Sequence, residues 1–233
     1  MAILVGALQV VFAQAADDAP ASRAIEANTA SAQDGLGIRM LRSVEPDEPG
    51  PFTAKARLHR YLQNLIGPVP LLFEAAAAGT MQGLDKPPEW GQEPGGYFKR
   101  LGNDFAYHGV RSTLSYATAG FLREDNRYFA SGKSGILPRV AHAVAATVIA
   151  HNEDGRDRLS VSAITGVVGA SLISRAWSPP SWQGGGSVGH SIAYTFAAEA
   201  GFHVFQEFVP DIIRSLQKEK PPRRLRSGVS ATP

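Results

Sequence analysis

Apolar residues recur at helical spacing through most of the chain. Leucines 58, 62 and 65 and Ile66 fall on one side of a helix, with Thr53 suited to cap its start and Gly67 to end it. Pro210 and Asp211 are expected to break or restart the last helix, because proline removes a backbone donor. The pattern predicts further helices over 68–84, 97–122, 136–151, 160–174 and 187–208.

One segment allows a β alternative. Residues 147–162 fit either a helix end followed by a turn, or two short strands joined at Asp154-Gly155, a pair common in hairpin turns. The alanines before this segment favour helix up to it. The sequence therefore predicts an all-α bundle of about five to six Gly/Ala-rich helices, with room for one short β-hairpin near 147–162.

Small residues recur every four positions in several predicted helices and so share one helix face. They allow two backbones to approach closely, which offsets the cost of about 1 kcal/mol for each helical glycine. Membrane helices use such ladders, yet the apolar segments are shorter than the roughly 20 residues that a span needs. A soluble bundle and a membrane-associated, self-associating one both stay open. The ladder residues are Gly79, Gly83, Gly102, Gly166, Ala170, Gly189, Ala193, Ala197 and Gly201.

The two ends of the chain differ from its middle. Residues 1–15 hold a short apolar run followed by Ala13-Gln14-Ala15, which predicts a signal peptide cleaved before Ala16. Residues 16–52, rich in Ala, Ser, Asp and Pro, are expected to form a disordered linker to a helical domain over 53–217. Residues 218–233 read as a disordered basic tail, either solubilising or in contact with anionic lipid.

Composition narrows the function classes. The chain has no cysteine, which excludes disulfides, thiolate catalysis and cysteine zinc sites. Its net charge of +2 is too small to indicate nucleic-acid binding. The segment 132–134, Gly-Lys-Ser, lacks the upstream glycine of a phosphate-binding loop, because position 127 is arginine. The histidines show no compact metal-binding spacing, so we expect neither a metal nor a cofactor.

Several polar motifs stand out between Phe52 and Ile212. The segments GYFKRLGNDFAYHGVRSTLSYA, FLREDNRYFASG, RVAHAVAATVIAHNEDGRDRLSVSAITG, ISRAWSPP and QEFVPDI follow one another in this order. Together they resemble an uncharacterised family of exported bacterial proteins, in which proline stands at the place of Asn126. The resemblance implies export and an envelope location, and no activity. It marks as the polar skeleton Lys99, Arg100, Gly102, Asp125, Arg127, Tyr128, Phe129, Arg139, Asp154, Gly155, Pro179 and Glu207.

The long predicted helix carries the best candidate for catalysis. Arg100, Asp104 and His108 are four residues apart and share one helix face. A histidine beside an aspartate can act as a general base, as in a hydrolase. The simpler interpretation is an ion pair between Arg100 and Asp104, which needs no function. The chain also lacks a Gly-x-Ser-x-Gly nucleophile motif, which favours the simpler interpretation.

The segment 123–129, with the sequence REDNRYF, is expected to connect helices rather than to do chemistry. Arg127 is predicted to bridge Asp125 and Glu207, with Tyr128 and Phe129 buried beside them. The sequence thus favours an exported, non-enzymatic envelope protein, either structural or associated with the lipid membrane. A periplasmic hydrolase using His108 and Asp104, and a soluble periplasmic binding module, are the alternatives.

Overall fold

A computed structural model describes residues 35–152 and 156–218 of the chain. Residues 35–42 form a helix in a unit that ends at Arg42, and a second compact unit starts at Ser43. The predicted signal peptide, the predicted linker up to residue 34, the tail beyond Lys218, Asp154 and Gly155 lie outside the described residues.

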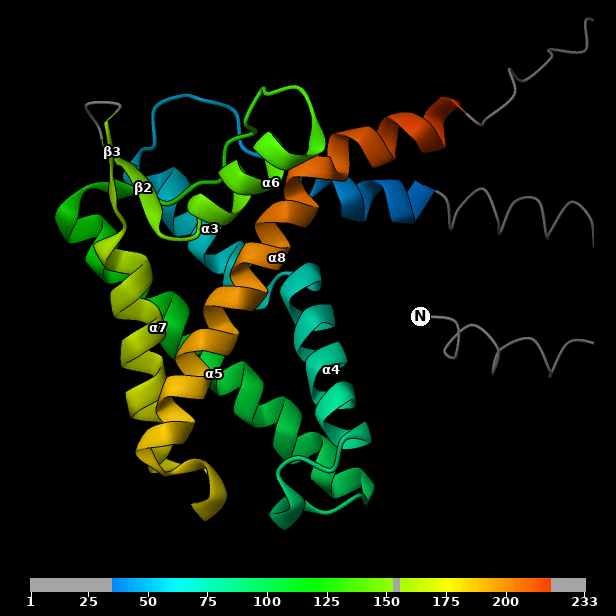
Figure 1. The fold of residues 1–233 in the computed structure, drawn as a ribbon, viewed down its shortest axis with the longest axis vertical. Coiled ribbons are helices and arrows are strands. Elements are labelled where there is room, and N and C mark those ends of the chain that lie inside the picture. The colour runs from blue at the N-terminus through cyan, green and yellow to red at the C-terminus, as the bar shows by residue number, and fades with distance from the viewer. Residues whose placement is uncertain (1–34, 153–155, 219–233) are drawn as a thin grey trace, which may run out of the picture. The chain divides into compact units, whose positions relative to one another are not determined.

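The second unit is a helical bundle with a small sheet, which confirms the predicted fold class (Figure 1). Helix α5 packs against α3, α4 and α7, while α8 packs against α6 and α7. The helices are α3 (Ala54–Ile66), α4 (Pro68–Gly83), α5 (Pro94–Leu122), α6 (Ile136–Ala145), α7 (Val161–Ile173) and α8 (Gly185–Lys218). Short 3-10 turns at Pro88–Trp90, Ser174–Ala176 and Pro180–Trp182 lie between them.

Helix ends follow the local signals of the sequence. The Thr53 hydroxyl accepts a hydrogen bond from the Ala56 amide at 3.2 Å and caps α3, and Gly67 ends that helix. Prolines occupy the first turn of α4, where their missing amide has no partner to lose. The Ser160 hydroxyl accepts from the Ala163 amide at 3.2 Å and caps α7.

The sheet occupies a region for which the sequence left two structures open. Strands β1 (Glu124–Asp125), β2 (Ile149–Asn152) and β3 (Asp157–Leu159) pair antiparallel in that order. Asp125 faces His151 across one pair, and His151 faces Asp157 across the other. Helix α6 therefore ends at Ala145 and not near His151, because the chain pairs with β1 and cannot continue as a helix.

Helix α8 continues through Pro210, contrary to the predicted break. A proline inside a helix loses one hydrogen bond and strains the preceding turn. Here Val209 is fully buried and Ile213 is nearly so, on the two sides of the proline. Burial of this stretch of α8 offsets the local cost, as tertiary packing commonly does.

The closest helix contact lies between α5 and α7. A Cβ atom at Gly166 would come within 2.0 Å of the Ser115 hydroxyl oxygen and 2.9 Å of the Arg111 carbonyl oxygen. A Cβ at Gly169 would lie 2.5 Å from a Leu114 methyl. Only glycine allows these backbones to come so near, and Ala170 is fully buried on the same helix.

The other predicted ladders lack such a contact. A Cβ atom added at Gly79, Gly83, Gly102, Gly189 or Gly201 would meet nothing within 4 Å, so these glycines do not mediate close packing among the described residues. Ala193 and Ala197 are exposed on α8. The helical period placed each ladder on one face, but the face buried in the bundle is decided by neighbouring helices. Among the helices described here, none has the length and apolar run that a membrane span requires.

The domain begins before Thr53. Val44 is buried, and its carbonyl accepts a hydrogen bond from the Gln206 side chain of α8 at 3.2 Å. The Asp47 amide donates to the Tyr128 carbonyl at 2.7 Å. Residues 43–52, predicted to belong to a disordered linker, are thus part of the compact unit that starts at Ser43.

Candidate functional site: a polar cavity between the helices

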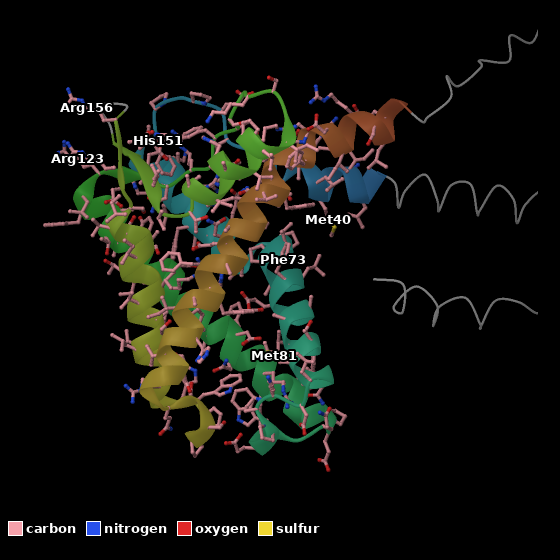
Figure 2. All side chains as sticks on the ribbon, in the orientation of Figure 1. Met40, Phe73, Met81, Arg123, His151 and Arg156 are labelled. Carbon is pink, nitrogen blue, oxygen red and sulfur yellow. The ribbon has the colours of Figure 1, made fainter. Side chains whose placement is uncertain are left out.

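A cavity of about 1260 Å³ lies between helices of the bundle, with lining residues from α3, α4, α5, α7 and α8. Phe73 and Met81 line it from α4, on which Figure 2 marks both side chains. Tyr61 of α3 and Tyr116 of α5 line it with stacked rings 4.7 Å apart, and Phe73 meets Phe202 of α8 edge-on at 5.4 Å. The cavity therefore has aromatic walls.

Polar residues reach the cavity because they share one face of α5 and one face of α8. On α5 they include Asp104, Tyr107, His108 and Arg111, in which 104 and 108, and 107 and 111, are four positions apart. On α8 they recur with the same period at Ser191, Thr195, Glu199, His203 and Gln206. Glu74 is the only charged residue of α4, and it also lines the cavity.

A chain of hydroxyl groups joins α5, α7 and α8 across the cavity wall. The Tyr107 hydroxyl lies 3.0 Å from the Ser171 hydroxyl and 2.9 Å from the Thr195 hydroxyl. The Ser171 hydroxyl donates onward to Ser191 at 3.3 Å. Three helices are thereby held together by polar side chains, which also offer hydrogen-bond donors and acceptors at the cavity surface.

An ion pair between Arg111 and Glu199 connects α5 with α8. Burial acts to lower the pKa of Arg111, but the charge of Glu199 and its hydrogen bond raise it above the ordinary value. Only one oxygen of Glu199 is used in this pair. Its Oε2 atom is buried and has no hydrogen-bond partner among the described residues.

His108 lies between two acceptors. Its Nε2 atom is 2.7 Å from the Asn64 carbonyl oxygen, which can only accept, so Nε2 carries the proton. Its Nδ1 atom is 3.4 Å from a carboxylate oxygen of Glu74. Burial, followed by the charge of Arg111, lowers the pKa of His108. Burial, followed by the charge of Asp104, raises the pKa of Glu74 to about 7. Glu74 is therefore mainly protonated below about pH 7 and mainly ionised above it, while His108 stays uncharged near neutral pH.

Asp104 is a second carboxylate of the cavity with few hydrogen-bond donors around it. Burial raises its pKa to about 6, and a hydrogen bond from the Asn103 side-chain amide at 3.1 Å acts in the opposite direction. The predicted pairing of Asp104 with His108 is not seen, because His108 contacts Glu74 of α4 instead. Spacing along α5 placed both residues on one face, but a side chain from another helix is the nearer partner.

The geometry does not support a serine nucleophile at His108. Ser112 is the nearest hydroxyl, 3.4 Å from Nε2. A general base needs a free lone pair on that nitrogen, and the Asn64 carbonyl requires a proton there. In the described part of the chain, no group of three or more His, Cys, Asp or Glu side chains is arranged to hold a metal ion.

Arg100 does not pair with Asp104, contrary to the simpler interpretation of that helix face. Its guanidinium is almost fully buried and donates to the carbonyls of Lys86 at 2.7 Å, Gly91 at 2.7 Å and Pro87 at 3.0 Å. It also donates to the Gln82 side chain. Arginine satisfies these carbonyls with several donors of one planar group, so it holds the loop between α4 and α5. Lys99 beside it is exposed.

The segment 123–131 contacts two helices, and one of the two predicted partners of Arg127 is found. Glu124 accepts hydrogen bonds from the Val161 and Ser162 amides at 3.1 and 2.9 Å, at the start of α7, where the helix dipole favours a negative charge. Arg127 pairs with Asp125 at 2.6 Å and lies 4.4 Å from the centre of the Phe52 ring, but it does not reach Glu207.

Glu207 receives its arginine from α6. Arg139 Nε lies 3.0 Å from Glu207, and Arg139 also contacts Asp211 at 2.7 Å. The buried Tyr128 hydroxyl donates to Glu207 at 2.6 Å and the Ser131 amide donates at 3.0 Å. Burial acts to raise the pKa of Glu207, but the hydrogen bonds from Ser131, Tyr128 and Arg139 lower it below its ordinary value.

The remaining predicted residues have local roles. The Phe129 ring lies 5.1 Å from the Arg127 guanidinium and 5.2 Å from the His151 ring. Pro179 is buried and precedes the short turn Pro180–Trp182. His151, Arg123 and Arg156 lie near the sheet, away from the Phe73 side chain that lines the large cavity (Figure 2).

Sequence reasoning missed the residues contributed by α4 and α8. Glu74 is a lone carboxylate in an apolar helix, and Ser191, Thr195, Glu199 and His203 repeat every four residues on α8. Both signals are visible in the sequence, but small residues on the same helices also predict close packing, and the two patterns overlap. Comparison with protein-family models, with curated proteins and with solved structures gave no match. The function proposed below is therefore inferred from the residues of the site.

Proposed function

We propose that the protein is a binding module that takes up a small molecule in the cavity between α4, α5 and α8. The observation that carries the proposal is the cavity of about 1260 Å³ with aromatic walls and a few converging polar groups. Ligand sites in proteins are typically concave and largely apolar, with volumes of about 300–1,000 Å³ and a small number of polar groups that orient the ligand.

A binding role fits the polar groups better than hydrolysis does. Arg111 and Glu199 neutralise one another, and the Tyr107 hydroxyl already bridges Ser171 and Thr195. Such groups are held in place before a ligand arrives, which lowers the entropy cost of binding. A hydrolase would require an activated nucleophile, and His108 directs its proton toward a carbonyl.

The test uses Nile red, an uncharged dye whose emission shifts to the blue in an apolar site. Ala77 lines the cavity on α4, so Ala77→Phe is expected to fill part of it and to weaken dye binding about tenfold or more. Ala76→Phe, at an exposed neighbouring position outside the cavity lining, is the matched control and should bind like wild type. Equal dye affinity in both variants, with both still folded by circular dichroism, would overturn the proposal.

A second candidate, membrane or self-association, is favoured by exposed apolar side chains. Leu72 of α4 is 54% exposed, Phe121 of α5 is 87% exposed and Leu137 of α6 is 80% exposed. Large exposed apolar side chains can mark interaction surfaces when they cluster. Flotation with phosphatidylglycerol vesicles, compared with phosphatidylcholine vesicles and with sedimentation of the protein alone, tests it. A monomer that stays at the bottom of the gradient with both lipids would remove this candidate.

Export also stays a proposal, because it rests on the N-terminal segment of the sequence. Mass spectrometry of the mature protein, expressed with its natural N-terminus, is expected to find Ala16 as the first residue. An intact Met1 on a protein recovered from the cytoplasm would contradict it.

A further inference from the structure

Glu74, Asp104 and Glu199 line the cavity, with one arginine, Arg111, among their partners. Arg111 pairs with Glu199, and its charge also acts on Glu74. The pKa of His108 is lowered by burial, so the imidazole supplies little positive charge near neutral pH. The ionisable residues that line the cavity from α4, α5 and α8 are Glu74, Asp104, Tyr107, His108, Arg111, Tyr116, His190, Tyr194, Glu199 and His203.

The other arginines that line the cavity are bound to other groups. Arg60 is bound to Asp47 and Arg127 is bound to Asp125. Arg57 donates to the Glu124 carbonyl at 2.6 Å. Each of these side chains is already engaged beside the start of α3 and the segment 123–131, so Glu74 and Asp104 depend on other partners.

A separate observation comes from Glu199. Its Oε2 atom is buried without a hydrogen-bond partner in the described part of the chain, although the residue lines the cavity. A buried carboxylate oxygen costs free energy unless a donor reaches it. That oxygen is closed to a water-sized donor, so an ammonium reaches it only after the Glu199 side chain turns toward the cavity. An ammonium group carries three donors and a positive charge, which would then satisfy this oxygen and would also suit the carboxylates of Glu74 and Asp104.

The aromatic walls suit the rest of such a ligand. Tyr61, Tyr116, Phe73 and Phe202 all line the cavity. Aromatic faces attract cations and cover apolar groups equally well. A ligand with a charged head and an apolar body would thus use both kinds of lining.

We propose that the cavity binds a small organic cation, a primary ammonium on an aromatic or aliphatic body, held by Glu74, Asp104 and Glu199. This inference rests on the proposed binding function and names its ligand class. Binding releases a proton from the Glu74 or Asp104 carboxyl to solvent, since a neighbouring ammonium stabilises the ionised carboxylate. Affinity therefore rises with pH between about 5 and 8 and falls again where the amine itself loses its proton.

The experiment compares two probes of equal size, 2-phenylethylammonium and the neutral 2-phenylethanol, by isothermal titration calorimetry at pH 8. The wild type is expected to bind the ammonium about tenfold or more tightly than the alcohol. At pH 6.5, where Glu74 is mostly protonated, titration in phosphate and in ACES buffer is expected to give different apparent enthalpies, because the released proton is taken up by the buffer. Asp104→Asn and Glu74→Gln should each reduce the preference for the ammonium while alcohol binding persists. The exposed Glu93→Gln, outside the cavity lining, is the control and should keep the preference.

The outcomes separate this inference from the proposed function. Equal affinities for the two probes, or tighter binding of the anion 3-phenylpropionate, would overturn the cation inference and leave the binding module standing. Failure of both probes and of Nile red would overturn the binding module itself. If the variants do not fold, the wild-type preference and the buffer dependence of its enthalpy decide the matter alone.

Discussion

Glu207 and Glu74 are both removed from solvent in the same bundle, yet their surroundings act on them in opposite directions. Glu207 accepts hydrogen bonds from Tyr128, Ser131 and Arg139, and its pKa is lowered. Glu74 has the Nδ1 atom of His108 at 3.4 Å, and its pKa is raised to about 7. The difference lies in the donors supplied by neighbouring elements, and not in burial.

The comparison separates two kinds of buried charge. A carboxylate whose oxygens accept hydrogen bonds from several donors holds the neighbouring elements in one arrangement. Glu207 does so for α6, α8 and the segment 123–131. A carboxylate that stays short of donors beside a cavity is costly to the empty protein and is available to a ligand. Groups with pKa values displaced by burial are common at functional sites for this reason.

The largest expected effect comes from breaking the Glu207 network. Arg139→Ala is expected to lower the unfolding free energy by about 3–5 kcal/mol, because it leaves a buried carboxylate without its cation. Urea denaturation at pH 7 measures it. Arg214 also contacts Asp211 but has a side chain that is 67% exposed, so Arg214→Ala should change stability by less than about 0.5 kcal/mol. Equal effects of the two substitutions would show that Glu207 is not the critical partner.

The next largest effect is the pH dependence that Glu74 gives to the unfolding free energy. Its folded pKa of about 7 exceeds the ordinary value of 4.5, so the folded state holds the proton more tightly. Stability contributed by this group is present below pH 4.5 and is lost as the pH rises through about 7. One pKa unit corresponds to about 1.4 kcal/mol, so the loss amounts to about 3 kcal/mol.

Glu74→Gln removes this titration. The stability of the wild type relative to the variant is expected to fall by about 3 kcal/mol between pH 4.5 and pH 8, measured by urea denaturation at each pH. Asp104→Asn should show the same sign between its ordinary 3.8 and about 6. A difference between wild type and Glu74→Gln that stays constant with pH would place Glu74 in the same class as Glu207.

A third prediction compares a closed helix contact with an open helix face. Gly166→Ala should lower the unfolding free energy by about 1–3 kcal/mol, because the new Cβ would meet Ser115 and the Arg111 backbone. Gly79→Ala should raise it by about 1 kcal/mol, because the position is helical with nothing within 4 Å. Thermal melts of both variants measure the two signs, and the same sign for both would contradict the assignment of the contact.

The smallest effect is expected from the hydroxyl chain. Tyr107→Phe removes the group that bridges Ser171 and Thr195, and should lower the unfolding free energy by about 1 kcal/mol. Tyr194, which is 59% exposed on α8, provides the control Tyr194→Phe, expected to be neutral. If urea denaturation shows that Tyr107→Phe has a higher unfolding free energy than wild type, the hydroxyl chain destabilises the fold and is kept for function.

Local signals in the sequence determined the helices, the Thr53 cap and the Gly67 stop, and they limited residues 147–162 to two structures. These features depend on residues within a few positions of one another, where spacing and backbone preference act directly. The period of α5 likewise placed Asp104, His108 and Arg111 on one face. That much follows from the chain alone.

Only the tertiary structure decided which partners those side chains meet. His108 contacts Glu74 rather than Asp104, Arg100 turns to the loop carbonyls at 86–91, and Glu207 takes Arg139 rather than Arg127. Each correct partner comes from another helix or loop, 68 residues away in the case of Arg139. Periodicity fixes the face of a helix but not its neighbour, because neighbours are set by how the apolar faces of all helices bury together.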